Sequence, residues 1–280
     1  MTLSMTVRQA LAQSGLVPLD AQVLLAHALE RDRAWLAAHP QDMLPRAEAE
    51  RFFALAKRRR EGEPVAYLAG KREFFGLALN VTPEVLIPRP ETETLVEVAL
   101  GRLPTGRDAR VLDLGTGSGA IALALAHERP QAQVLGVDIS EAALAIAREN
   151  ARRLELGNVS FLRSDWYGSL DAAARSTFDL VVANPPYIAA ADPHLSEGDL
   201  RFEPAVALSP GTDGLMALRR IVADAPLWLS PGAWLVVEHG YDQGAEVRDL
   251  LVEAGFVELA SARDLAGIPR VAAGRLATGS

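Results

Sequence analysis

The stretch Val111-Leu112-Asp113-Leu114-Gly115-Thr116-Gly117-Ser118-Gly119-Ala120 decides the fold of this chain. Its apolar beginning is typical of a buried strand, and a glycine-rich turn then leads into the start of a helix. Glycines allow a tight turn and a close approach of the backbone to a ligand. The spacing also satisfies the G-x-G-x-x-G/A pattern of dinucleotide-binding folds. The loop alone therefore does not distinguish a nicotinamide cofactor from another adenosine ligand.

Strands and helices alternate along the chain beyond Arg107, which predicts a mainly parallel sheet covered on both faces. The predicted strands are 110–114, 133–139, 159–163, 178–183 and 233–238. The predicted helices are 119–128, 141–154, 214–229 and 243–254, and residues 256–276 suit two more strands that close an edge. Ser140 is the expected N-cap of the second helix.

The residues before this sheet predict a second, smaller domain. Apolar side chains recur with helical spacing through residues 1–73, which indicates a small helical bundle. Residues 74–88 suit a hairpin or an extended linker, because residues that precede a proline avoid the helical region. A helix is expected from Glu91 to about Arg102, within a second domain that occupies residues 89–280.

The helical domain contains one conspicuous basic run, Lys57-Arg58-Arg59-Arg60. We interpret it as a solvated helix end, since cations suit the negative end of the helix dipole. Contact with RNA or with an acidic partner is the alternative.

Composition excludes several classes of protein. The net charge of −8 argues against a protein built mainly to hold nucleic acid, and the absence of cysteine excludes disulfide scaffolds and thiolate zinc sites. His127-Glu128 does not continue into a zinc-binding H-E-x-x-H motif, so no metal is expected. We find no signal peptide and no apolar run long enough to span a bilayer, which favours the cytoplasm; a monomer is expected.

A carboxylate, Asp138, ends the strand that follows the glycine-rich loop. At that place it can accept hydrogen bonds from both hydroxyls of a ribose. The loop and Asp138 together predict a nucleoside cofactor.

The tetrapeptide Asn184-Pro185-Pro186-Tyr187 follows the predicted strand 178–183. Two prolines cannot continue a central strand, because neither carries an N–H and each fixes φ. The chain must leave the sheet at Asn184. An amide, two carbonyls and an aromatic ring then stand at the carboxyl edge, where open α/β sheets bind ligands.

These groups suit the alkylation of a planar nitrogen, whose delocalised lone pair makes it a weak nucleophile. The Asn184 side-chain oxygen and the Pro185 carbonyl can accept the two N–H hydrogens of such a group, and Tyr187 can pack on its flat face. The lone pair then faces an activated methyl group. Positioning of this kind can lower a barrier by about 7–11 kcal/mol. The pattern is that of Rossmann-like methyltransferases, with S-adenosylmethionine as the methyl donor and S-adenosylhomocysteine as the product.

Over nearly its whole length the chain resembles the glutamine methyltransferases of peptide chain release factors, the HemK or PrmC family. Beside the two motifs above, the resemblance is carried by 62–70, Glu73-Phe74, Leu86-Ile87-Pro88-Arg89-Pro90-Glu91-Thr92-Glu93, Ser164-Asp165-Trp166 and Arg201-Phe202-Glu203-Pro204. It implies a Rossmann-like class I methyltransferase domain of α/β fold behind a helical bundle. It also implies methylation of the glutamine in the Gly-Gly-Gln loop of release factors, at the side-chain nitrogen N5.

The resemblance further assigns residues to roles. It places Asp165-Trp166 at the adenine, Asp138 on the ribose and the loop near the methionine part. The implied cofactor-binding residues are Gly115, Thr116, Gly117, Ser118, Gly119, Asp138, Asp165, Trp166 and Asn184. The implied substrate-binding residues are Asn184, Pro185, Pro186, Tyr187 and Arg89, of which Asn184, Pro185 and Tyr187 are the catalytic set. For Arg89 the alternative to substrate binding is a structural role, and for His239 the alternative to lining the pocket is also a structural role. The helical domain is expected to recognise the release factor.

Three other functions remain open at this point. A ribosomal-protein glutamine methyltransferase shares Asn-Pro-Pro-Tyr, but the Ile87–Glu93 form resembles the release-factor branch. An adenine-N6 methyltransferase of nucleic acid is weakened by the acidic balance. A non-catalytic module that binds release factors would not need an intact cofactor loop.

Overall fold

The computed structural model describes residues 5–104, 108–189, 198–209 and 213–278. The start of the predicted helical domain, residues 1–4, and Arg107, where the predicted alternation begins, lie outside the described residues. The chain divides into two compact units. The described part of one comprises residues 5–71 and 198–202, and the other contains the remaining described residues.

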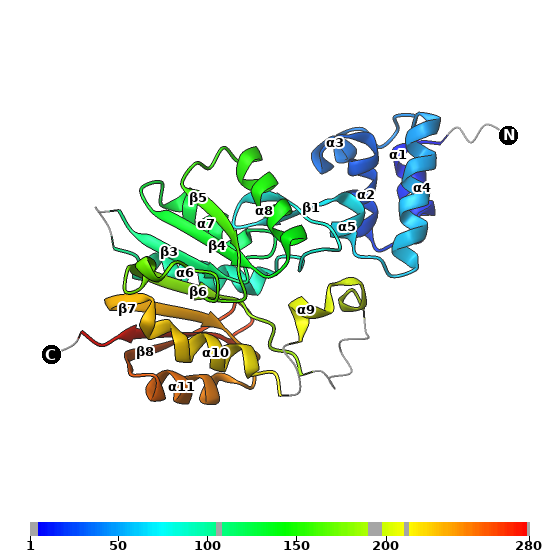
Figure 1. The fold of residues 1–280 in the computed structure, drawn as a ribbon. Helices are drawn as coiled ribbons and strands as arrows, with labels where there is room; N and C mark the ends of the chain where they lie inside the picture. The colour runs from blue at the N-terminus through cyan, green and yellow to red at the C-terminus, as the bar shows by residue number, and fades with distance from the viewer. Residues whose placement is uncertain (1–4, 105–107, 190–197, 210–212, 279–280) are drawn as a thin grey trace. The chain divides into compact units, whose positions relative to one another are not determined.

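The first unit is the helical bundle that the sequence predicts. Its helices are α1 (Val7–Gln13), α2 (Pro18–Leu29), α3 (Arg33–Ala38), α4 (Arg46–Arg60) and α5 (Val65–Ala69) (Figure 1). Leu24, Leu25 and Phe52 are completely buried in its core. Thr6 and Gln9 form a capping box at the start of α1, which satisfies two amide groups that the helix leaves unpaired.

The basic run forms the last turn of α4, and its arginines are bound within the helical unit. Arg59 donates to Asp20 Oδ2 at 2.7 Å and to Asp199 Oδ1 at 2.8 Å, and its side chain is only 23% exposed. Arg58 pairs with Glu63. The prediction of a helix end is confirmed, but the term solvated is wrong for Arg59, because two carboxylates hold it.

The second unit contains a seven-stranded mixed sheet with the order β5-β4-β3-β6-β7-β9-β8. Its strands are β3 (Arg110–Leu114), β4 (Gln133–Asp138), β5 (Val159–Arg163), β6 (Phe178–Ala183), β7 (Leu229–Glu238), β8 (Phe256–Arg263) and β9 (Pro269–Leu276). The pairs from β5 to β7 are parallel, and β9 is antiparallel to both of its neighbours. The predicted α/β fold class and the two closing strands are confirmed.

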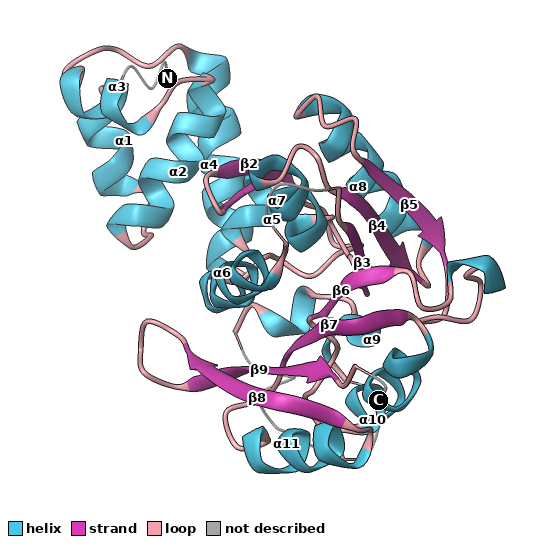
Figure 2. Ribbon diagram, turned by 90° about the vertical axis from the view of Figure 1, so that its left-hand side faces the viewer, coloured by secondary structure: helices cyan, strands magenta, loops and turns pink. Residues whose placement is uncertain are grey.

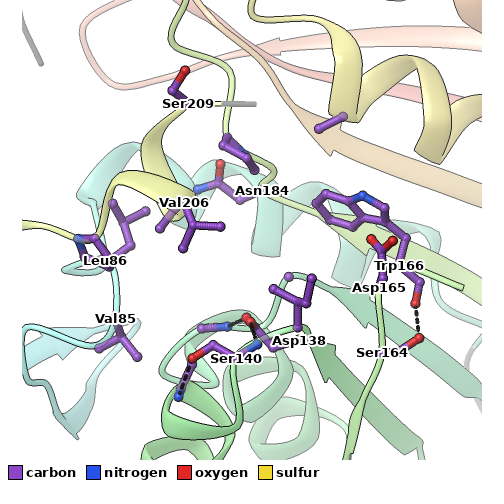
Figure 3. A pocket seen from close by; sticks show the side chains of 18 of the residues that line it. Val85, Leu86, Asp138, Ser140, Ser164, Asp165, Trp166, Asn184, Val206 and Ser209 are labelled. Carbon is purple, nitrogen blue, oxygen red and sulfur yellow. Dashed lines mark hydrogen bonds between the residues drawn. The ribbon is translucent and has the colours of Figure 1, made fainter. Parts of the chain in front are cut away.

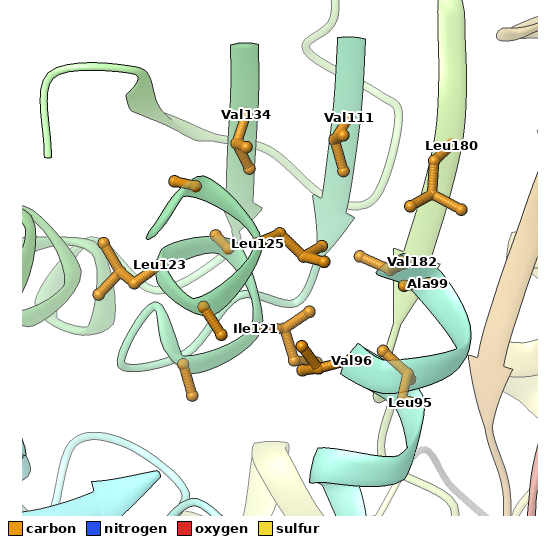
Figure 4. Packing of buried hydrophobic residues seen from close by; sticks show 14 of the residues in the cluster. Leu95, Val96, Ala99, Val111, Ile121, Leu123, Leu125, Val134, Leu180 and Val182 are labelled. Atoms are coloured by element: carbon orange, nitrogen blue, oxygen red, sulfur yellow. The ribbon is translucent and has the colours of Figure 1, made fainter. Parts of the chain in front are cut away.

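Helices cover both faces of this sheet (Figure 2). They are α6 (Glu93–Arg102), α7 (Ala120–Glu128), α8 (Glu141–Arg153), α10 (Met216–Asp224) and α11 (Gly244–Glu253), while the short α9 (Ala205–Leu208) belongs to the same unit. Short 3₁₀ helices are η1 (Pro90–Thr92), η2 (Ala172–Ala174), η4 (Leu200–Phe202, in the helical unit) and η5 (Ala225–Leu227). On one face, side chains of α6 and α7 such as Val96 and Ile121 pack against Val111 and Leu180 (Figure 4). On the other, α10 and α11 pack against alternate residues of the same strands.

A hairpin precedes the sheet. It is one of the two alternatives predicted for residues 74–88, but it begins earlier, at Lys71, and ends at Asn80. It consists of β1 (Lys71–Phe74) and β2 (Leu77–Asn80), joined by Phe75 and Gly76, both at positive φ as a type I′ turn needs. Asn150 of α8 accepts from the Asn80 amide at 2.7 Å and donates to the Asn80 and Ser118 carbonyls at 3.0 Å each. One buried amide thus fixes both the hairpin and the glycine-rich loop.

Two predicted boundaries around β7 are wrong. The predicted helix 214–229 is shorter, because Pro226 has no N–H to continue the helical hydrogen bonds after Asp224. The predicted strand 233–238 starts earlier, at Leu229. Pro231 and Gly232 resemble a turn but lie inside a register shift, where Phe178 pairs with Leu229 and Leu180 with Trp234.

Candidate active site

A cavity of about 430 Å³ lies in the second unit at the carboxyl ends of the central parallel strands. Asn184 and Val206 line one side, Asp138 and Ser140 lie opposite, and Asp165 and Trp166 close a third side (Figure 3). The strand order reverses at β3, whose neighbours are β4 and β6. Ligands of open α/β sheets bind at such a point, so the topology and the cavity agree.

The glycine-rich loop contributes backbone to the cavity. Gly115, Gly117 and Gly119 all have left-handed φ, at +72°, +56° and +86°. Gly115 and Gly117 line the cavity, and no protein atom lies within 4 Å of the place where a Cβ of Gly117 would stand. At Gly119 a Cβ would meet Leu123 at 2.9 Å, so this glycine permits helix packing.

Asp113 is completely buried and forms hydrogen bonds with the glycine-rich loop and with the helix that follows it. Its Oδ2 accepts from the Thr116 hydroxyl at 2.6 Å and from the Ala122 amide at 3.2 Å, while Oδ1 has no hydrogen-bond partner among the described residues. Burial raises the pKa of Asp113 to about 7 against these hydrogen bonds. Thr116 and Ser118 are themselves buried and do not line the cavity, so any cofactor contact from them would come from the backbone.

Asp138 faces the cavity and binds two backbone amides. Oδ2 accepts from Gly117 and Oδ1 from Ser140, both at 2.9 Å. Burial raises the pKa of Asp138, and these hydrogen bonds oppose the shift. Each oxygen keeps lone-pair capacity for a further donor. Ser140 caps α8 as predicted, since its hydroxyl accepts from the Ala143 amide at 3.2 Å.

The segment Ser164–Trp166 follows β5 and presents the indole to the cavity. Trp166 has a φ of +51°, rare for a bulky residue, and its carbonyl accepts from the Ser164 hydroxyl at 2.7 Å. Asp165 is exposed and pairs with Arg220, whose Nη1 lies 2.7 Å from Oδ2. Arg220, which also lines the cavity, was missed because α10 lies far along the chain from Asp165.

Asn184 lies directly after β6 and lines the cavity. Its Nδ2 donates to the Thr92 hydroxyl at 3.0 Å, which leaves the side-chain oxygen to accept from another group. Pro186 also lines the cavity, whereas Pro185 is buried and, with Tyr187, is not among the lining residues. The Tyr187 hydroxyl instead donates to Glu238 Oε1 at 3.1 Å, and burial raises its pKa.

Arg89 does not line the cavity and has an internal partner. It forms an ion pair with Glu203, whose side chain is 0% exposed and also accepts from the Ile87 amide at 3.1 Å. These contacts join two segments that carry the family resemblance. They suit the alternative of a packing role, while substrate binding by Arg89 stays a prediction.

His239 is fully buried at the end of β7. Its Nδ1 lies 2.7 Å from the Gly240 carbonyl, and burial lowers its pKa. The preceding Glu238 is 1% exposed and accepts the hydrogen bond from the Tyr187 hydroxyl. Neither residue lines the cavity.

The described ranges contain no cluster of three or more His, Asp or Glu side chains with the geometry of a metal site. Within the same ranges, none of the helices has the length and apolarity that a membrane span requires.

The chain is similar to several known proteins. Family models described as a PrmC N-terminal domain and as a methyltransferase domain match residues 3–70 and 106–209. A release factor glutamine methyltransferase of Xylella fastidiosa is 56% identical over 256 residues, covering 91% of this chain and 92% of the relative. A protein of the same name from Burkholderia pseudomallei is 53% identical over 276 residues, covering 97% and 96%. A solved methyltransferase structure from Pyrococcus furiosus shares the fold, with a TM-score of 0.54 and 18% identity over 79% of this chain and 97% of that one.

Proposed function

Because the chain belongs to the family of release factor glutamine methyltransferases, we propose that it methylates the glutamine of the Gly-Gly-Gln motif in peptide chain release factors. The methyl group comes from S-adenosylmethionine, which leaves as S-adenosylhomocysteine, and replaces one hydrogen on the side-chain nitrogen N5, which is released as a proton. The observation that carries the proposal is the cavity in which the glycine-rich loop, Asp138 and Asn184 meet. The proposed substrate places the enzyme in the cytoplasm, with the translation machinery.

The cavity fits the proposed cofactor. Its volume of about 430 Å³ lies in the range of small-molecule sites, roughly 300–1,000 Å³. Gly117 leaves open space beside its backbone, as close approach to a ligand requires. Asp138 would accept from the ribose hydroxyls, Trp166 would lie against the adenine, and Gly115 and Gly117 would lie near the methionine part. S-adenosylmethionine, when bound, supplies a methyl group activated by a positively charged sulfur.

The protein's part in the reaction is to orient the amide of the glutamine. The Asn184 oxygen and the Pro185 carbonyl accept its two N–H hydrogens, so the nitrogen lone pair is directed at the methyl group. The barrier falls mainly through orientation, which can contribute about 7–11 kcal/mol. Tyr187, whose hydroxyl is held by Glu238, packs beside the flat amide.

Mass spectrometry of a release factor incubated with the enzyme and S-adenosylmethionine tests the proposal. We expect the mass of one methyl group on the Gly-Gly-Gln peptide and no change in a release factor whose motif glutamine is replaced by glutamate. Ribosomal proteins and adenine-containing DNA are included in parallel. If a ribosomal protein or the DNA is methylated while the release factor stays unmethylated, the proposal is overturned in favour of the corresponding alternative.

We assign recognition of the release factor body to the helical unit, because a glutamine side chain offers too little surface for selection. The assignment predicts a much lower KM for an intact release factor than for a short Gly-Gly-Gln peptide, with similar kcat. Equal KM values for protein and peptide would show that the helical unit has another purpose.

A further inference from the structure

Four polar side chains from separate parts of the second unit form one hydrogen-bonded network behind the cavity. Asn184 Nδ2 donates to Thr92 Oγ1 at 3.0 Å, and Tyr187 donates from its hydroxyl to Glu238 Oε1 at 3.1 Å. The Thr92 hydroxyl also acts on the Glu238 carboxylate as a donor that lowers its pKa, and this interaction links the two pairs. Thr92 and Glu238 are 4% and 1% exposed, and neither lines the cavity.

The chemistry of these groups fixes the direction of every hydrogen bond in the network. An ionised carboxylate only accepts, and a hydroxyl has a single hydrogen to donate. When Thr92 gives its hydrogen to the ionised Glu238, only lone pairs remain on its oxygen for Asn184, as the contact with Asn184 Nδ2 requires. Asn184 must therefore turn its NH₂ group to Thr92, and its oxygen is left for the substrate.

The direction matters because the two halves of the Asn184 amide have nearly the same shape and opposite chemistry. A glutamine substrate presents an NH₂ group, which needs an acceptor. An Asn184 turned by half a rotation would present its own NH₂ group, and two donors would face each other. A misdirected amide would therefore fail to hold the substrate nitrogen.

We propose that Thr92 and Glu238 are positioning residues for methyl transfer, in which the buried Glu238 carboxylate orients the Thr92 hydroxyl and Thr92 orients the Asn184 amide with its oxygen toward the substrate. This inference rests on the proposed function, since it concerns how the same site holds an amide. Glu238 orients Tyr187 through the same carboxylate.

The burial of Glu238 supports a purpose beyond packing. A buried carboxylate is costly unless its oxygens are well paired, yet Oε2 has no hydrogen-bond partner among the described residues. The pKa of Glu238 is raised to about 7, mainly by burial and to a smaller extent by the charge of Glu91. The hydrogen bonds from Thr92 and Tyr187 and the charge of Arg270 on β9 oppose this shift. The adjacent His239 has a pKa lowered by burial, so it adds no charge near neutral pH.

Protonation of Glu238 removes the constraint on the network. A protonated carboxyl can donate to Thr92, and the threonine hydroxyl can then donate to the Asn184 oxygen. The flipped amide becomes accessible, so methyl transfer should slow as the pH falls through about 7.

The experiment compares single-turnover methyl transfer at saturating substrates in the wild type and in three variants. Thr92→Val keeps the shape and loses the hydroxyl, Thr92→Ser keeps the hydroxyl, and Glu238→Gln replaces the obligate acceptor by a group that also donates. We expect Thr92→Val to lower the rate at least about tenfold, Thr92→Ser to restore most of it, and calorimetry to show unchanged cofactor affinity in both. The control is Thr177→Val, which loses a hydroxyl bound to the Ala174 carbonyl outside the site and should keep the wild-type rate.

The pH profile supplies the second readout. The wild-type rate should rise through about pH 7, whereas Glu238→Gln should be slow and without this step. A wild-type rate in folded Thr92→Val, or an unchanged acid limb in Glu238→Gln, would overturn the inference. A wild type that transfers no methyl group to the release factor is a different result, because it rejects the proposed function itself.

Discussion

The amide of Gly117 donates to Asp138 Oδ2 over 2.9 Å, so the loop after β3 is bound to the carboxylate that ends β4. Asp138 therefore shapes the glycine-rich loop as well as facing the cavity. Its second oxygen binds the Ser140 amide at the start of α8. A single side chain thus sets the relative positions of two backbone segments that line the proposed cofactor site, and substitutions in this pair should affect cofactor affinity before anything else.

The first prediction concerns Gly117. Gly117→Val places a branched side chain at φ +56° in the space reserved for a ligand, so measurable binding of S-adenosylmethionine should be lost. Isothermal calorimetry measures this directly, and circular dichroism confirms the fold. Gly255→Val is the matched control, because Gly255 also has positive φ with open space around it and lies away from the cavity. Wild-type affinity in folded Gly117→Val would contradict the assignment of the loop.

The second prediction concerns Asp138. Asp138→Ala removes the acceptor of two amides and of the proposed ribose hydroxyls, which should weaken cofactor binding by about 1–3 kcal/mol. Asp138→Asn keeps one acceptor oxygen, so its affinity should lie between those of the wild type and Asp138→Ala. Nicotinamide cofactors should bind none of the three proteins. Equal affinities in the three proteins would show that Asp138 has no part in cofactor binding.

The third prediction concerns Asn184. Asn184→Ala removes an acceptor for the substrate amide and leaves its nitrogen misoriented, so turnover should fall on the order of 10²-fold or more. Cofactor affinity should change much less, because Asn184 faces the transferred group. Asn184→Asp still accepts a hydrogen bond and should keep partial activity. Kinetics on an intact release factor measure both variants. Near wild-type turnover in Asn184→Ala would show that Asn184 only ends a strand and has no role in methyl transfer.

The fourth prediction concerns Asp113 and the pH dependence of stability. Burial raises its pKa from 3.8 to about 7 in the folded state, so the folded protein binds the proton more tightly than the unfolded chain. The contribution of Asp113 protonation to the stability of the folded state is fully present below pH 3.8 and is lost as the pH rises through about 7. Asp113→Asn cannot ionise. The free energy of unfolding of this variant should therefore increase relative to that of the wild type as the pH rises from 5 to 8. Urea unfolding at several pH values measures the difference, and a constant difference would show that Asp113 does not titrate in this range.

Local patterns predicted most of the fold. Residues of β3, β5 and β6 are apolar runs between clear turn signals, so their bounds follow from the sequence alone. The bounds around β7 did not, because Pro231 and Gly232 are ordinary turn residues and only pairing with β6 keeps them in a strand. Local propensity gives way to tertiary pairing at such places.

The candidate site was predicted where a motif is contiguous and missed where contacts join distant residues. The glycine-rich loop, Asp138 and Asn184 each follow a recognisable strand. Thr92 belongs to a predicted helix start and to a stretch that carries the family resemblance, and neither indicates that its hydroxyl binds Asn184, 92 residues further along the chain. The spacing of apolar residues along the chain does not predict a side-chain contact between residues so far apart.

The position of Asp199 has a consequence for how the chain folds during synthesis. Arg59 in α4 obtains its second carboxylate from a residue that leaves the ribosome much later. From Lys71, where the first part of the helical unit ends, to Asp199 there are 199 − 71 = 128 residues. At roughly 5–20 residues per second this interval lasts about 6–26 s. Until most of the sheet has been translated, Arg59 in the nascent helical unit therefore has Asp20 as its carboxylate partner, together with the Glu63 carbonyl, and lacks Asp199.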